Sequence, residues 1–320
     1  MKLGVFTPLF QNLPFEAMLD HVASMGVQAV ELGTGAWPGD AHCKPKELLE
    51  NPAKAQAFRK SIDSRGLIIS GLSCHGNPLH PDRATASEYD RIYRNTIHLA
   101  SALEVPVVNL FSGCPGDSDQ SKYPNWVTCV WPPDFETVHK WQWEEKVIPY
   151  WQGASKLASE SGIKLAFEMH PGFVVYNPET LLRLRKAVGA VIGANYDPSH
   201  LFWQGIDPVA SIRLLEGAIY HVHAKDTYVD RANTAANGVL DTKPYSDLAH
   251  RAWSFRTVGF GHDQFTWREL VSTLRLVGYD YVLSIEHEDA MLSVDEGFSK
   301  AVSFLKEVLL TEQPSAMWWA

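Results

Sequence analysis

The sequence predicts an α/β fold, a single-domain (β/α)8 barrel. Eight short apolar runs alternate with eight longer segments of helical periodicity along the 320 residues, a length that α/β barrels commonly reach as one domain. The alternative is an open doubly wound sheet, but no Gly-x-Gly-x-x-Gly motif follows the first apolar run. Gly259 and Gly261 lie late in the chain and outside a strand–turn–helix setting. We therefore favour the barrel.

The elements are expected in strict alternation. Strands are expected over residues 2–7, 28–33, 67–75, 105–111, 163–170, 191–197, 219–225 and 281–288. Helices are expected over residues 15–25, 53–65, 87–103, 141–161, 178–188, 207–216, 264–277 and 294–310. Asn177-Pro178 and Asp207-Pro208 are typical of an N-cap followed by proline in the first helical turn. Four predicted helices are followed directly by a glycine, as a left-handed C-terminal cap requires: Gly26, Gly66, Gly162 and Gly278.

Two connections exceed the length of ordinary barrel loops. Residues 112–140 follow the fourth strand and residues 226–263 follow the seventh, so both are expected at the C-terminal face, where active sites of such barrels lie. We expect them to form a wall or lid over the site. The barrel is expected to span residues 1–310, and residues 311–320 are expected to form a tail that docks on the body or on a neighbouring subunit.

Composition limits the class of protein. The net charge is −9, which gives the chain no electrostatic reason to bind nucleic acid or an anionic membrane. No stretch of about 18 apolar residues offers a membrane span. The four cysteines have no C-x-x-C spacing and read as free thiols. With no signal-peptide pattern at the N-terminus, we expect a cytoplasmic protein.

Polar residues gather at the ends of the last four predicted strands. In LAFEMHPG, residues 165–172, Glu168 and His170 follow a buried run and share one face, because side chains two residues apart point the same way. The next three strands repeat this spacing with Asn195 and Asp197, with His221, His223 and Lys225, and with Ser284, Glu286 and Glu288. One such inward histidine is usually a hydrogen-bonded core residue, but four consecutive strands place polar groups at the same height.

Several carboxylates converging in a dry site repel one another by several kcal/mol, roughly. A divalent cation removes that repulsion. Oxygen ligands with one imidazole suit Mn²⁺, Mg²⁺, Co²⁺ or Zn²⁺, and the predominance of hard oxygen ligands favours Mn²⁺. The sequence therefore predicts a divalent metal site at the C-terminal end of the barrel.

The motifs FEMHPG, NYDPSHL, YHVHAKD and SIEHED occur in this order, and the chain resembles the xylose-isomerase-like TIM barrels over nearly its full length. This sugar phosphate isomerase/epimerase group includes ketose 3-epimerases and inosose isomerases and dehydratases. The resemblance implies that the metal ligands are Glu168, Asp197, His223 and Glu286. It also implies that Glu168 and Glu286 are the catalytic carboxylates, and that His200 is a catalytic histidine near metal and substrate.

Other residues near the strand ends are candidate substrate ligands, each with an ordinary structural alternative. They are His170, Lys225, Arg256, His75 and Asn109. His170 could instead bond a neighbouring strand, Lys225 could pair with Asp226 or Glu286, and Arg256 could form a surface salt bridge. Glu31 is expected in the pocket wall, and His75 shares its loop with Asn77. Three aromatic residues are candidates either for stacking on a sugar or for the core: Trp126, Trp131 and Phe173.

The resemblance implies a metal-dependent isomerase or epimerase that acts through an enediolate on a keto-sugar, an oxidised sugar or a cyclitol. A lyase on the same scaffold is the alternative, either an inosose dehydratase-like enzyme or one that cleaves a 3-oxo-glycoside or C-glycoside with a small partner subunit. A non-catalytic sugar-binding barrel is the least expected. Ala232 and Val229 replace the histidine of related apurinic endonucleases and the arginine of ketose 3-epimerases. We expect a small carbohydrate substrate and a homo-oligomer.

Overall fold

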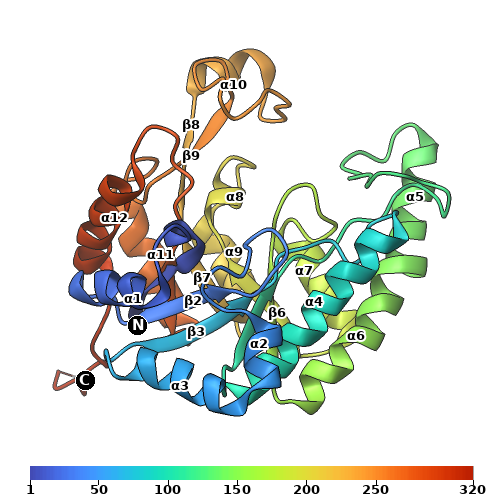
Figure 1. Cartoon of the computed structure of the whole chain (residues 1–320). Helices are drawn as coiled ribbons and strands as arrows, with labels where there is room; N and C mark the ends of the chain where they lie inside the picture. Colours follow the sequence, from blue (N-terminus) through green and yellow to red (C-terminus); the bar gives the residue numbers. More distant parts are fainter. Residues whose placement is uncertain (320) are drawn as a thin grey trace.

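Eight parallel strands close into a barrel with the order β1-β10-β7-β6-β5-β4-β3-β2 (Figure 1). In this computed structural model, which describes residues 1–319, the strands are Lys2–Phe6 (β1), Ala29–Gly33 (β2), Ile68–Ser73 (β3), Val107–Leu110 (β4), Lys164–Glu168 (β5), Ile192–Tyr196 (β6), Ile219–Ala224 (β7) and Val282–Ile285 (β10). Each lies within a predicted strand, so the predicted (β/α)8 fold class is confirmed.

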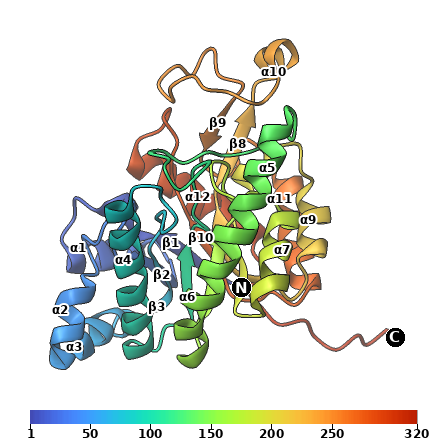
Figure 2. The same cartoon turned by 90° about the vertical axis from the view of Figure 1, so that its right-hand side faces the viewer.

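Helices cover the outside of the barrel (Figures 1 and 2). Those that follow the barrel strands include Phe15–Ser24 (α1), Pro52–Asp63 (α3), Arg83–Ala102 (α4), Ile148–Glu160 (α6), Pro178–Val188 (α7), Pro208–Leu214 (α9), Gln264–Leu276 (α11) and Val294–Val308 (α12). Asn177 and Asp207 cap α7 and α9 through their side-chain oxygens, as predicted. The four predicted cap glycines all have a positive φ: Gly26, Gly66, Gly162 and Gly278. Three shorter helical segments are Thr7–Phe10 (η1), Pro45–Glu50 (α2) and Ser199–Phe202 (α8).

Two predicted helix starts are wrong. The helix expected from residue 87 begins at Arg83 (α4). The helix expected over residues 141–161 begins at Pro133 and runs through α5 (Pro133–Trp141), a π-helical stretch (Gln142–Val147) and α6. Phe135, Val138 and Trp141 recur at helical spacing in α5, so the sequence carried a signal for this helix although every side chain of α5 is at least partly exposed. The connection after β4 is therefore shorter than the expected 112–140 loop.

The connection after β7 contains regular structure. Strands β8 (Asp226–Val229) and β9 (Trp253–Arg256) form an antiparallel hairpin, and α10 (Arg231–Asn237) lies between them in the chain. The hairpin and α10 rise above the carboxyl ends of the barrel strands (Figures 1 and 2). This segment therefore stands over the barrel mouth, as predicted for residues 226–263, and the structure adds that it contains a hairpin and a helix.

A buried carboxylate fixes the end of this connection. Asp226 Oδ2 accepts hydrogen bonds from the backbone N–H groups of Gly259, Gly261 and His262. A Cβ at Gly261 would lie 2.5 Å from Asp226 Oδ1, which explains the glycine there. The Gly259–Gly261 pair thus binds a carboxylate of the protein itself.

Side-chain alternation divides each barrel strand between an outer and an inner face. On β5, Phe167 packs edge-on against Trp151 of α6 at a ring distance of 4.7 Å, whereas Ala166 and Glu168 occupy the alternate positions. Glu168 pairs in register with Asn195 of β6, and the two side chains are hydrogen bonded. The polar residues of neighbouring strands therefore meet inside the barrel.

The segment that follows α12 is hydrogen bonded to α11. The Arg275 guanidinium donates to the carbonyl oxygens of Leu310 and Glu312, while Trp318 and Trp319 are exposed. A boundary at residue 310 and docking of the tail stay predictions. Within residues 1–319, no helix is both long enough and apolar enough to cross a membrane.

Candidate metal centre

The four predicted metal ligands meet at the carboxyl end of the barrel. Glu168, Asp197, His223 and Glu286 each offer a ligand atom, and these four atoms all lie within 4.8 Å of one another. Glu168 ends β5, Asp197 follows β6, His223 lies in β7 and Glu286 follows β10. Parallel strands end at the same edge of a barrel, so period-two spacing on four strands produces one cluster.

The cluster is buried, and its polar atoms lie close together. His223 Nδ1 lies 2.8 Å from Glu286 Oε2 and 3.3 Å from Glu168 Oε2. His200 Nε2 lies 3.0 Å from Glu168 Oε1 and 3.3 Å from Asp197 Oδ2. The side chain of Glu286 is 15% exposed, and the other four are at most 3% exposed. Electrostatic interactions here are consequently stronger than in water.

Burial and neighbouring charged groups shift the pKa values of the cluster residues. Burial opposes ionisation of Glu168, but hydrogen bonds from His200, His223 and His75 hold its pKa well below the usual value. Burial and the nearby carboxylates raise the pKa of Asp197. Burial likewise opposes ionisation of Glu286, yet Lys225 and His223 lower its pKa to about 2. The ionised forms of Glu168 and Glu286 are thus stabilised by cationic neighbours, whereas Asp197 is shifted towards its neutral form.

The donor set fits a divalent cation. Asp197 Oδ2 lies 3.3 Å from His200 Nε2 and 3.6 Å from Lys225 Nζ. Glu286 Oε2 lies 2.8 Å from His223 Nδ1 and 3.3 Å from Lys225 Nζ. Both oxygens face the cluster, where a bound cation would be coordinated by them in place of these ion pairs. Three carboxylates and one imidazole are suitable ligands for Mn²⁺, Co²⁺, Zn²⁺ or Mg²⁺.

Glu31 lies beneath the cluster and was not predicted to support it. Its carboxylate accepts hydrogen bonds from Ser73 at 2.5 Å, Asn109 at 2.8 Å and Ser284 at 2.7 Å, and lies 3.0 Å from His223 Nε2. Glu31 is fully buried, so it belongs to the barrel interior and not to the expected pocket wall. It orients the ligand His223 from the side opposite the cluster.

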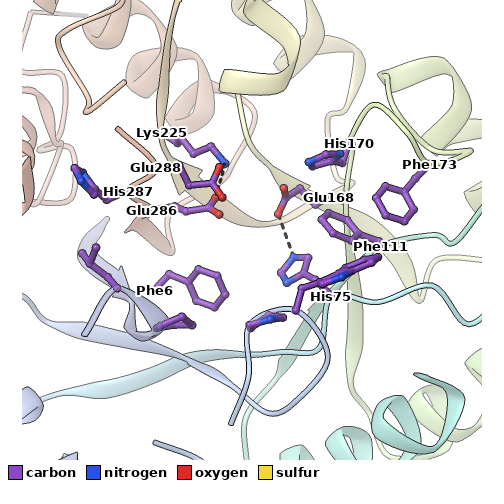
Figure 3. A pocket seen from close by; sticks show the side chains of 14 residues that line it. Phe6, His75, Phe111, Glu168, His170, Phe173, Lys225, Glu286, His287 and Glu288 are labelled. Atoms are coloured by element: carbon purple, nitrogen blue, oxygen red, sulfur yellow. Dashed lines mark ion pairs between the residues drawn. The ribbon is translucent and has the colours of Figure 1, made fainter. Parts of the chain in front are cut away.

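A cavity of about 500 Å³ opens above the metal ligands (Figure 3). It is lined by Phe6, Pro8, Leu9, Trp37, Pro38, His75, Phe111, Glu168, His170, Phe173, Lys225, Glu286, His287 and Glu288. Glu168 and Glu286 face each other across its floor, and Phe6, Phe111 and Phe173 form apolar walls (Figure 3). A few charged groups among apolar walls are typical of a small-molecule site.

Three of the predicted substrate ligands line this cavity. His75 Nε2 lies 3.1 Å from Glu168 Oε2. Lys225 is nearly fully buried, with Nζ 3.3 Å from Glu286 and 2.7 Å from Glu288. His170 donates its Nδ1–H to the carbonyl of Pro171 at 2.6 Å, so its Nε2 is left as a hydrogen-bond acceptor.

The structure does not bring the other two to the cavity wall. Asn109 lies below the metal ligands, where it donates to Glu31 and contacts His221 Nδ1 at 3.2 Å. Arg256 pairs with Asp289 at 3.0 Å. Among the other sequence candidates, Asn77 bonds the backbone of Cys114, Trp131 is 73% exposed and Phe173 lines the cavity.

Sequence reasoning missed the aromatic wall contributed by the first strands. Phe6 stacks on the ring of the ligand His223 at 5.6 Å, and Trp37 packs edge-on against Phe173 at 5.7 Å. Phe6 ends β1, so its position at a strand end was the signal that could have identified it. Trp37 lies in the loop after β2 and gave no such signal.

Comparison with known proteins agrees with this geometry. The family profile described as xylose isomerase-like TIM barrel matches residues 19–308. The uncharacterized protein YfiH of Bacillus subtilis (strain 168) is 40% identical over 312 residues, which cover 97% of this chain and 99% of that protein. Inosose dehydratase of Geobacillus thermodenitrificans (strain NG80-2) is 27% identical over 299 residues, 92% of this chain and 90% of the other.

Solved structures share the fold. The IOLI protein with a bound zinc atom superposes with a TM-score of 0.65 at 17% identity, covering 97% of this chain and 98% of that one. D-psicose 3-epimerase, crystallised in the presence of D-fructose, gives a TM-score of 0.64 at 16% identity, with 97% and 99% covered.

Proposed function

We propose that this chain, which belongs to the xylose isomerase-like TIM barrel family, is a divalent-metal-dependent isomerase or epimerase of a keto-sugar, oxidised sugar or cyclitol. The observation that carries the proposal is the convergence of Glu168, Asp197, His223 and Glu286 at the carboxyl end of the barrel, where Glu168 and Glu286 line a 500 Å³ cavity. A structural role alone gives no reason to gather three carboxylates beside an open cavity.

Mn²⁺ is the proposed ion because three of the four ligands are carboxylates. Zn²⁺ is the second candidate, since the structurally similar IOLI protein holds a zinc atom. A bound cation would polarise the substrate carbonyl and stabilise the negative charge that develops when the neighbouring proton leaves.

The two glutamates are placed to move that proton. They come from β5 and β10, which are separated by β6 and β7 around the barrel, and they face each other across the cavity floor (Figure 3). Hydrogen bonds from its histidine neighbours keep Glu168 ionised, and Lys225 does the same for Glu286, so either carboxylate can accept the substrate proton. We assign this step to Glu168. Glu286 must first take up a proton from solvent before it delivers one from the opposite side, and Glu168 then loses its proton to solvent; the outcome is an inverted stereocentre or a relocated carbonyl.

His200 and Lys225 contact these two carboxylates and favour their ionised forms. His200 Nε2 lies 3.0 Å from Glu168 Oε1 and fixes the direction of this carboxylate. Lys225 Nζ lies 3.3 Å from Glu286 and stabilises its ionised form. Both are positioning residues in this proposal, and His75 and His170 are left to bind substrate oxygens.

A lyase or dehydratase is the second candidate, and His170 favours it. Its Nε2 is a hydrogen-bond acceptor in the cavity wall beside Glu168. Burial, His200 and Lys225 lower the pKa of His170 to about 3, so the ring is neutral and its Nε2 can accept a hydrogen bond from a substrate hydroxyl group. The similarity to inosose dehydratase supports this candidate as well.

The test is hydrogen exchange in D2O with Mn²⁺ present, on ketohexoses, inososes and 3-oxo-glucosides, followed by NMR and mass spectrometry. Deuterium beside the carbonyl together with a new stereoisomer or a moved carbonyl supports the isomerase or epimerase. Exchange with release of water or an aglycone supports the lyase. Equal exchange by Glu168→Gln and the unmodified protein would contradict both.

A further inference from the structure

A second cavity adjoins the first. It measures about 410 Å³ and is lined by Trp126, Thr128, His170, Pro171, Gly172, His200, Trp203, Leu240, Asp241, Thr242, Tyr245, Trp253 and Phe255. His170 belongs to the walls of both cavities. His200, which contacts Glu168 and Asp197 on one side, presents its ring edge to Phe255 at 5.2 Å. The second cavity therefore lies directly beside the metal centre.

Its walls come mostly from the two long connections, which gather aromatic rings here. Trp253 and Phe255 lie on β9, Tyr245 lies between the hairpin strands, and Trp126 lies in the connection after β4. Lys225, a wall residue of the first cavity, places Nζ 4.3 Å from the ring centre of Phe255. The hairpin thus forms one aromatic wall that reaches from the second cavity to the first.

The rings hold one another in place. Trp203 and Trp253 stack with centroids 4.7 Å apart and planes 5° apart, and Tyr245 stacks on Phe255 at 5.9 Å. The guanidinium of Arg251 lies 4.3 Å from the ring centre of Tyr245 and 4.7 Å from that of Trp253. A preorganised aromatic wall favours a flat ring, because stacking then costs little side-chain entropy.

The one carboxylate of the second cavity within residues 1–319 is already engaged. Asp241 accepts hydrogen bonds from the backbone N–H groups of Ala252 and Lys243 and from Lys243 Nζ. The polar groups that remain are the indole N–H groups of Trp126 and Trp203, His170 Nε2 and the hydroxyl groups of Thr128, Thr242 and Tyr245. Stacked rings make up more of the wall than these groups do, so the wall favours a flat aromatic ring, and cellobiose tests a second sugar in its place.

We propose that this second cavity is a subsite for an aryl group attached to the sugar that the first cavity holds. The inference rests on the proposed function in that it takes the first cavity to bind the sugar. An apolar cavity of about 150 Å³ is enough for one benzene ring, so 410 Å³ accommodates a substituted aromatic ring. The natural substrate is then an oxidised aryl glycoside and not a free sugar.

The experiment compares three probes by calorimetry on the Mn²⁺-loaded protein: phenyl β-D-glucopyranoside, methyl β-D-glucopyranoside and cellobiose. We expect the phenyl glucoside to bind at least about tenfold more tightly than the methyl glucoside. Saturation-transfer NMR should show the phenyl protons closest to the protein. Cellobiose should bind no better than the methyl glucoside.

Two substitutions locate the ring. Tyr245→Ala removes one exposed wall residue, and Thr242→Trp fills the cavity from an exposed position. Each should abolish the preference for phenyl and leave the affinity for the methyl glucoside unchanged. Tyr228→Ala is the matched control, because Tyr228 is an equally exposed tyrosine of the same hairpin that lines neither cavity.

Equal affinities for the phenyl and methyl glucosides, or no saturable binding of the phenyl glucoside, would overturn the inference. So would a phenyl preference that survives Tyr245→Ala and Thr242→Trp, or cellobiose binding as tightly as the phenyl glucoside. Hydrogen exchange on keto-sugars tests the proposed catalysis independently of the subsite. A phenyl preference without exchange would leave the subsite standing and remove the proposed catalysis, and exchange without the preference would do the reverse.

Discussion

Glu31 and Glu286 contact opposite edges of the same imidazole. Glu31 Oε1 lies 3.0 Å from His223 Nε2, and Glu286 Oε2 lies 2.8 Å from His223 Nδ1. Burial disfavours the imidazolium, but Glu31 and Glu286 raise the pKa of His223 well above its usual value. Glu31 would keep the Nε2–H of His223 hydrogen bonded while Nδ1, on the cluster side, served as the ligand atom for a cation, so Glu31 would fix the tautomer.

Replacing Glu31 should therefore weaken metal binding without removing a ligand. Glu31→Gln keeps the shape of the side chain but loses the negative charge that holds the Nε2–H of His223. We expect Mn²⁺ affinity to fall by about 10–100-fold, measured by calorimetric titration of the metal-free protein. Gln28→Glu, an exposed substitution near the same strand, is the control. An unchanged affinity in Glu31→Gln would mean that Glu31 serves the fold alone.

The ligands themselves should separate metal binding from turnover. Asp197→Asn and His223→Ala should lower metal occupancy and activity together, because each removes or weakens one of four ligands. Glu168→Gln should abolish turnover yet retain part of the metal, since its amide oxygen still coordinates. Metal content by mass spectrometry beside hydrogen exchange distinguishes the cases. Full metal occupancy in all three variants would contradict the site.

Removing the metal should be reversible. Treatment with EDTA should abolish hydrogen exchange and lower the melting temperature, because the stabilisation from a bound cation among three buried carboxylates is then lost. Adding Mn²⁺ or Co²⁺ should restore hydrogen exchange and the melting temperature. Ca²⁺ should restore both less well, because its larger coordination shell prefers more oxygen ligands. Activity and melting temperature that are both insensitive to EDTA would contradict a metal centre.

The strand pattern predicted the barrel and the convergence of polar side chains at its carboxyl end. On parallel strands, a spacing of two fixes the face and the strand end fixes the height, so Glu168, Asp197, His223 and Glu286 converge once the strands are recognised. That these four are the metal ligands was implied by the family resemblance and stays a prediction. The same spacing placed His170 and Lys225 near the opening, and His75 was expected there from the loop after the third strand. These positions depend only on local geometry and the closure of the barrel.

The misplaced residues depend on contacts that no local pattern encodes. Glu31 lies in AVELG, an ordinary buried strand, and its role arises from partners on four other strands. Arg256 was expected at the substrate, but the hairpin turns it toward Asp289. The second cavity likewise forms only when two loops distant in sequence bring Trp126 and Trp253 together.

Lys225 should stabilise the metal-free protein more than the metal-loaded one. Its Nζ lies 3.6 Å from Asp197, 3.3 Å from Glu286 and 2.7 Å from Glu288. Lys225→Met leaves these carboxylates without their cation, so we expect a loss of about 3–5 kcal/mol in unfolding free energy without metal. Saturating Mn²⁺ should recover part of it. Urea denaturation with and without Mn²⁺ measures both.

The matched control is Lys300→Met, which breaks an exposed pair with Glu296 at 3.4 Å. Exposed pairs contribute little, so this variant should differ from the unmodified protein by less than about 1 kcal/mol. Equal losses in Lys225→Met with and without Mn²⁺ would show that the two cations do not substitute for each other.

Asp289 should give the protein part of its stability above pH 4. Its carboxylate accepts hydrogen bonds from Arg256 Nε at 3.0 Å, from the Thr257 N–H at 2.9 Å and from the Met291 N–H at 2.8 Å. Burial opposes ionisation, but these donors lower its pKa below the ordinary 3.8. A depressed folded-state pKa contributes stability that is fully present above pH 3.8 and is lost as the pH falls through the lower, folded-state value.

Asp289→Asn should therefore lower the urea midpoint at pH 7, and the difference from the unmodified protein should shrink as the pH drops below 3.8. A difference that stays constant across this range would mean that the side chain acts through its shape and not through its charge.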